Sequence, residues 1–140
     1  MTLSARFFAT AAILALIGMA WGIQMSATHD HALSPAHGHL NLVGFVAMSI
    51  YGAFYGLFPA AADSRLAGFH YWLALAAVLV LTPGIAIAIA REQPALAQIG
   101  SLLTMASMAL FVWIVLRTGA RVRAGTTERQ QAGRDLAPAE

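Results

Sequence analysis

The 140-residue chain contains neither cysteine nor lysine, and only 10% of its residues are charged. The absence of cysteine excludes disulfides, thiolate metal sites and covalent attachment of a c-type haem. The apolar runs also contain no nucleophile beside a base, no paired carboxylates and no phosphate-binding loop, which argues against hydrolytic and phosphoryl-transfer chemistry. We likewise expect no nucleic-acid partner.

Hydrophobic residues are abundant instead, at 59% of the chain, and they form long runs without Asp, Glu, Lys or Arg. Crossing the hydrocarbon core of a bilayer takes about 20 helical residues. The runs are unbroken rather than alternating, which favours helices, and backbone polar groups in lipid must be paired within their own segment. The sequence therefore predicts an all-α, polytopic membrane protein with the lipid bilayer as its partner. It is expected to be a four-transmembrane-helix bundle with spans at 6–27, 37–58, 69–90 and 96–117.

These spans form one predicted domain, residues 1–119, followed by a polar tail at 120–140, for which disorder and a frayed extension of the last helix both remain open. Arginine supplies all of the Lys and Arg charge, and five of the eight arginines stand at or beyond the fourth span: Arg117, Arg121, Arg123, Arg129 and Arg134. The positive-inside rule then predicts cytoplasmic N- and C-termini in a multi-pass protein of a bacterial-type inner membrane. A cleaved signal peptide is the alternative for the first run, but that run is longer than a usual signal core.

Four of the five histidines lie in the segment "HDHALSPAHGHLN", His29 to Asn41, which joins the first two runs on the predicted outer side. At about 100° per residue, His37 shares a helix face with small and polar residues, namely Asn41, Gly44, Met48, Tyr51, Gly52 and Tyr55. This is the predicted packing face, and Gly52 and Gly56 form a small-xxx-small pair. The opposite face carries His39, Val43, Val46, Ile50, Ala53 and Leu57.

An imidazole on an otherwise apolar face fits two interpretations. His39 reaches back to interfacial water or a carbonyl, or it binds the iron of a haem whose ring is covered by Val43 and Val46. In the second case Asn41 and Tyr51 hydrogen-bond to a neighbouring helix or to ring substituents. The spacing permits haem without requiring it.

Residues 37–59, "HGHLNLVGFVAMSIYGAFYGLFP", resemble the second transmembrane helix of subunit I of the heme-copper oxidases, and more closely that of the related nitric oxide reductases. Residues 5–25 resemble the first helix of the same superfamily. The resemblance implies that His39 binds a low-spin haem b on the outer side of the membrane. The family's copper site and second haem lie on later helices that this chain does not have, so we expect no oxygen or nitric oxide reduction by the chain alone.

Candidates for the second axial ligand are Met25, Met105, the loop histidines His29 and His31, and His39 of a symmetry mate in a homo-oligomer. His70 is excluded, because the 19 residues from His39 to Phe58 place it roughly 28 Å away at 1.5 Å per residue. His70, beside Tyr71 and Trp72, is instead predicted to belong to an interfacial aromatic belt, with a second metal or haem site as the alternative.

A haem bound at His39 would serve electron transfer or gas sensing, and two other functions remain open. The first is an outward-facing copper or zinc site formed by His29, Asp30, His31, His37 and His39. The second is a structural or assembly subunit that docks on a larger respiratory complex. In the third span, Pro83 and Gly84 predict a bend, with the hydroxyl of Thr82 compensating for the lost backbone hydrogen bond.

Overall fold

The protein is described by a computed structural model, which covers the backbone of residues 1–135 and the side chains of residues 1–127. In this part of the chain every regular element is helical: α1 (Leu3–Thr28), α2 (Ser34–His39), a π-helix η1 (Leu40–Ala47), α3 (Met48–Leu57), α4 (Pro59–Ala62), α5 (Arg65–Arg91) and α6 (Ala95–Asp135). Helices α2, η1 and α3 follow one another without a break and form a single span. The predicted all-α fold class is confirmed.

Four helical stretches are long and apolar enough to cross a membrane: Leu3–Thr28, Ser34–Leu57, Arg65–Arg91 and Ala95–Thr127. Each contains most of one predicted span and extends past it at one end or both, because helices continue beyond the apolar residues that the prediction used. Helix α6 continues farthest, to Asp135, so the backbone is helical over 120–135. The end of the predicted tail, 136–140, lies outside the described residues.

The ends of the helices are set by local hydrogen bonds. The hydroxyl of Thr2 accepts from the amide of Ala5 to begin α1, and the hydroxyl of Ser64 accepts from the amide of Ala67 to begin α5. Each is the side-chain cap that a helix N-terminus requires. At the other end of these helices, His29 and Glu92 adopt the left-handed conformation, with φ of 54° and 55°. This conformation ends each helix and turns the chain into a loop.

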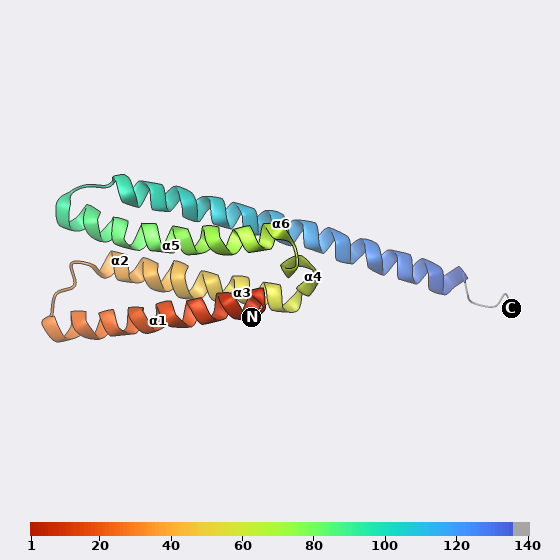
Figure 1. Ribbon diagram of the computed structural model, residues 1–140, viewed down its shortest axis with the longest axis horizontal. Helices are drawn as coiled ribbons and strands as arrows, with labels where there is room; N and C mark the ends of the chain where they lie inside the picture. The colour runs from red at the N-terminus through yellow and green to blue at the C-terminus, as the bar shows by residue number, and fades with distance from the viewer. Residues whose placement is uncertain (136–140) are drawn as a thin grey trace.

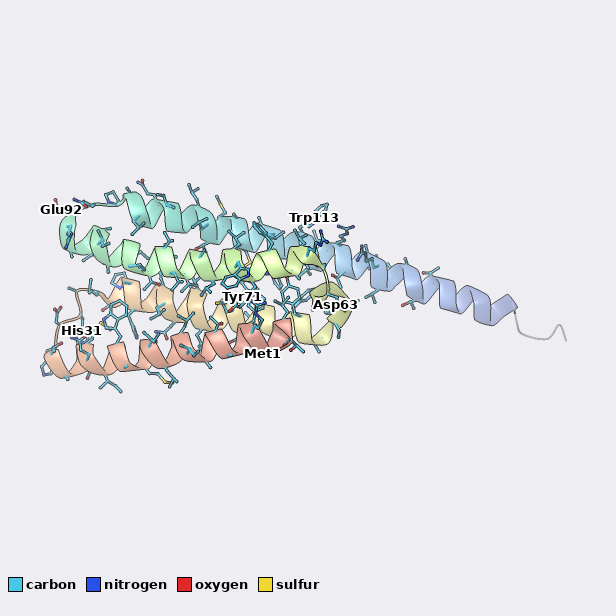
Figure 2. The ribbon with its side chains drawn as sticks, in the orientation of Figure 1. Met1, His31, Asp63, Tyr71, Glu92 and Trp113 are labelled. Carbon is cyan, nitrogen blue, oxygen red and sulfur yellow. The ribbon has the colours of Figure 1, made fainter. Side chains whose placement is uncertain are left out.

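The helices pair as two antiparallel hairpins (Figure 1). Helix α1 packs along η1 and α3, and α5 packs along α6, while contacts of α5 with α2 and η1 join the two hairpins. The His31 and Glu92 loops lie at one end of the bundle, and Met1 and Asp63 lie at the other (Figure 2). Helix α6 extends past this second end.

The face predicted to pack within the second span is confirmed. Gly44, Met48, Tyr51, Gly52 and Tyr55 are all buried. The hydroxyl of Ser4 donates to the carbonyl of Gly52 over 2.8 Å, which fixes α1 against α3. On the opposite face the side chains are exposed at the bundle surface, as expected for a lipid-facing side: Val46, Ile50, Ala53 and Leu57.

The closest approach of two backbones lies elsewhere, between α5 and α6. A Cβ added to Gly84 would come within 2.6 Å of the amide nitrogen of Ala97, and one added to Gly100 within 2.6 Å of that of Leu81. Helix α5 runs through Pro83 as one element. The hydrogen bond predicted for Thr82 is not formed, because its hydroxyl is buried without a partner among the described residues.

Candidate functional site

His39 is the last residue of α2, near the loop end of the bundle, and its side chain is exposed on the outer surface of the four helices. Its Nδ1 lies 2.8 Å from the carbonyl oxygen of Pro35, one turn earlier in the same helix. A carbonyl oxygen only accepts, so Nδ1 carries the proton of the neutral ring. Nε2 is therefore left with its lone pair.

This arrangement is the one that metal-binding histidines usually have. The ring nitrogen that does not bind the metal commonly donates to a backbone carbonyl or a carboxylate, which fixes the tautomer and raises the basicity of the other nitrogen. The carbonyl of Pro35 fixes the tautomer of His39 in this way. The chemistry available at His39 is thus that of an imidazole with a fixed orientation and one ring nitrogen without a protein partner among the described residues.

His39 lines an open groove between the second span and α6, with a volume of about 580 Å³. The size is typical of cofactor and ligand pockets. The other lining residues are mostly apolar: Leu42, Val43, Leu81, Ser101, Thr104, Met105, Met108, Ala109 and Val112. The hydroxyls of Ser101 and Thr104 donate to carbonyls of their own helix, so neither hydroxyl has a hydrogen left to donate to a ligand in the groove. The groove combines one imidazole, two thioethers and an apolar wall.

The π-helix η1 begins directly after His39 and contributes Leu42 and Val43 to the groove. In a π-helix each amide bonds to the carbonyl five residues earlier, so the turn is wider than in an α-helix. Such segments are rare and frequently occur at functional sites. Here the irregular segment stands immediately beside the candidate ligand.

Only part of the predicted haem environment lies in this groove. Val43 lines it together with His39, whereas Val46 is exposed beyond its edge. Tyr51 is on the buried face, where its hydroxyl points to the Sδ of Met108 at 3.9 Å. Asn41 packs against Gly18 of α1, while its amide nitrogen donates to the carbonyl of His37 in its own span over 3.0 Å. Tyr51 thus hydrogen-bonds to a neighbouring helix, which is one of the two interactions predicted for it.

His37 lies on the other side of the helix and contacts α1. Its Nε2 is 3.0 Å from the carbonyl oxygen of Gly18 and 3.1 Å from Nδ2 of Asn41. Trp21 packs edge-on against the ring, and a Cβ on Gly22 would come within 3.3 Å of Nε2. The imidazole of His37 is therefore used in helix packing, on the face opposite to His39.

The loop histidines do not converge with His37 and His39 on a common point. His29 ends α1, His31 is exposed, and one carboxylate oxygen of Asp30 accepts from the amide of Ala32 over 3.0 Å. Among the described residues the structure gathers no group of three or more His, Asp or Glu side chains that could hold a metal ion.

His70 is buried inside the bundle and is not exposed in an aromatic belt, so that prediction is wrong. None of its surface is exposed, its Nδ1 lies 3.0 Å from the hydroxyl of Tyr55, and its ring stacks on Phe111 at 5.7 Å. Helix α5 begins at Arg65, so His70 lies more than one turn inside it, on the face toward the other helices. Its contacts with Phe7 and Tyr55 place it at the end of the bundle opposite to His39, as the predicted separation requires.

Of the methionines considered as second ligands, Met105 shares the groove with His39. Met25 is 7% exposed and lines a different, smaller hollow near Asp30. The sequence did not single out the rest of the α6 wall. Ser101, Thr104, Met108 and Val112 recur at three- and four-residue spacing, which identifies one helix face but not which neighbour it meets.

No protein-family model, no curated protein and no solved structure matches the chain. The resemblance to the heme-copper oxidases and nitric oxide reductases therefore stays a prediction.

Proposed function

We propose that this four-span membrane protein binds one haem b in the groove beside His39 and transfers electrons. The observation that carries the proposal is that His39, with Nδ1 bonded to Pro35 and Nε2 free, lines the same apolar groove as Met105. Haem iron takes histidine and methionine as axial ligands, and a bundle of four helices is a common scaffold for such a site.

The residues present fit the group. Nε2 of His39 supplies a neutral nitrogen ligand, Sδ of Met105 supplies the thioether, and Leu42, Val43 and Val112 supply apolar surface for the ring. Haem bound in this way would supply reversible one-electron chemistry. With both His39 and Met105 holding it, the group would serve electron transfer rather than binding of a gas.

Three features of the chain itself control the site. The Pro35 carbonyl holds the His39 ring in one tautomer and one orientation. The apolar wall lowers the local polarity around the ligands, and the methionine ligand favours a higher reduction potential than a second histidine would. The oxidase-like stretch at 37–59 supports the same assignment. We infer that the site faces outward from a bacterial-type inner membrane.

The decisive measurement is the reduced-minus-oxidised absorption spectrum of the protein, purified in detergent after haem-replete expression. We expect a Soret band and about one haem per chain, lost in His39→Ala because no other lining residue offers an imidazole. His31→Ala is the matched control, since His31 is exposed in the loop. It should keep the full spectrum.

Met105→Leu tests the second ligand at nearly constant volume. We expect the haem to stay bound, with a shift from a low-spin to a high-spin spectrum, while Met25→Leu leaves the spectrum unchanged. A colourless wild-type protein that also fails to take up added haem would overturn the proposal. A full spectrum in His39→Ala would remove His39 from it, and a low-spin spectrum in Met105→Leu would remove Met105.

A further inference from the structure

A second pocket lies at the end of the bundle opposite to His39, between α4, the start of α5 and the last bundle turns of α6. Its volume is about 160 Å³, and its lining residues are Ala61, Ser64, Leu66, Ile114, Arg117, Thr118 and Arg121. Two of the seven are arginines and none is acidic. The pocket therefore has a positive electrostatic potential that its own walls do not neutralise.

Arg117 and Arg121 are four residues apart on α6, so both reach the same side of the helix. The two hydroxyl groups that line the pocket already donate to backbone carbonyls and do not offer a hydrogen to a ligand. Ser64 donates to the carbonyl of Ala61 over 2.9 Å, and Thr118 donates to that of Ile114 over 2.8 Å. Among the residues whose side chains are described, the pocket donors without a partner are the guanidinium groups, whose planar geometry matches the oxygens of a phosphate group.

An apolar groove of about 230 Å³ continues from this pocket. Its walls share Ala61, Thr118 and Arg121 with the pocket and add Leu57, Phe58, Pro59, Ala60 and Val122. The groove contains no residue of α6 before Thr118, so it can hold the end of an acyl chain that adjoins an anionic head, but not the rest of that chain. A free anion would use only the first half of this surface.

The depth of the pocket in the membrane fits the same ligand. Arg117 is the first charged residue after the apolar run of α6, and Arg65 and Arg6 bound the runs of α5 and α1. Arg65 and Arg6 are close in sequence to Asp63 and Met1, which lie at the same end of the bundle (Figure 2). Charged side chains that bound apolar spans mark the level where hydrocarbon gives way to lipid headgroups. The pocket is therefore at the level of lipid phosphates.

We propose that this pocket binds the phosphate group of an anionic phospholipid, with Arg117 and Arg121 on the phosphate oxygens and the headgroup end of an acyl chain in the groove beside Phe58. The site is distinct from the haem groove, with which it shares no lining residue. Its occupant is a structural lipid that links the C-terminal half of α6 to α4.

The test uses the full-length protein in detergent, titrated with short-chain phosphatidylglycerol, short-chain phosphatidylcholine or inorganic phosphate while lipid binding and thermal unfolding are followed. We expect phosphatidylglycerol to bind and to raise the unfolding temperature, and the other two probes to have little effect. Arg117→Gln with Arg121→Gln should weaken phosphatidylglycerol binding by about tenfold or more. Both side chains are exposed, so the double variant loses no core packing.

The matched control is Arg91→Gln with Arg123→Gln, which removes the same net charge away from the pocket and should leave binding within about twofold. Ala61→Leu keeps every charge and fills both the pocket and the groove, and it should weaken binding as the arginine variant does. Equal loss of binding in the control variant, or unchanged binding in the arginine variant, would overturn the site. Equal stabilisation by inorganic phosphate would overturn its assignment to a lipid.

Discussion

At the scale of single residues, the histidines differ in which ring nitrogen the protein uses. In His39, Nδ1 donates to the carbonyl of Pro35, and Nε2 is free at the surface of the groove. In His37 it is Nε2 that contacts α1, and in His70 Nδ1 pairs with Tyr55 while Nε2 is enclosed. Among these three, only His39 combines a fixed ring with a nitrogen that an incoming group can reach.

The pair formed by Tyr55 and His70 is a buried hydrogen bond, 3.0 Å long, within an aromatic cluster that includes Phe7 and Phe111. Removing one partner leaves a buried polar atom unsatisfied. We expect Tyr55→Phe to lower the free energy of unfolding by about 1 kcal/mol, as measured by thermal or denaturant unfolding in detergent.

A double-mutant cycle isolates this interaction. In the His70→Leu background the imidazole is already gone, so the same Tyr55→Phe substitution should cost almost nothing. If Tyr55→Phe costs the same free energy in both backgrounds, the hydrogen bond does not contribute to stability and packing of the phenol ring explains the whole effect.

At the scale of helices, the two hairpins are held together differently. Helix α1 meets α3 through glycines that face side chains of Phe7, Phe8 and Ser4. Helices α5 and α6 meet backbone to backbone at Gly84 and Gly100. In a membrane, where lipid is as apolar as the side chains, this kind of close approach is the main source of helix association.

Gly100→Ala should therefore destabilise the bundle. The new Cβ would lie 2.6 Å from the amide nitrogen and 2.9 Å from the Cβ of Leu81, and backbone atoms of a packed helix cannot move aside cheaply. We expect a loss of about 1–3 kcal/mol in the free energy of unfolding.

Gly119→Ala is the control on the same helix, because nothing lies within 4 Å of the added Cβ. There the better helix propensity of alanine should stabilise the protein by up to about 1 kcal/mol. Equal stability changes in the two variants would contradict the close α5–α6 contact.

At the scale of the whole molecule, the loops that contain His31 and Glu92 share one end of the bundle, and Met1 and Asp63 share the other (Figure 2). The arginine-rich part of α6 extends from this second end (Figure 1). The distribution of arginine then predicts that the His31 end faces outward and that Ala124 is cytoplasmic.

The absence of native cysteine makes this orientation directly testable with single-cysteine variants. A membrane-impermeant maleimide added to intact cells with a permeabilised outer membrane should label His31→Cys and Glu92→Cys. Ala124→Cys should react only after the inner membrane is opened. The opposite labelling pattern would reverse the topology and place the His39 groove near the cytoplasmic side.

The amino-acid sequence was enough to predict the class of protein and the number of spans, because charge-free apolar runs have few stable alternatives in lipid. It also determined the two faces of the second span, since helical periodicity separates Gly44 and Tyr55 from Ile50 and Leu57 whatever the neighbours are. His70 shows where this reasoning stopped. His70 lies near the start of its span beside Tyr71 and Trp72, which is typical of residues at the membrane–water interface. Only the packing of the neighbouring helices places its side chain in the core.

The candidate site was decided mainly by the tertiary structure. The sequence singled out His39 and named Met105 among several possible ligands, but it gave no reason to prefer Met105 over Met25. That choice depends on which face of α6 turns toward the second span. The pocket that Arg117 forms with Ala61 and Ser64 likewise depends on how α6 is rotated against its neighbours. Helical periodicity fixes neighbours within a helix, whereas contacts between helices depend on crossing points such as Gly84 and Gly100, where packing sets the rotation of each helix.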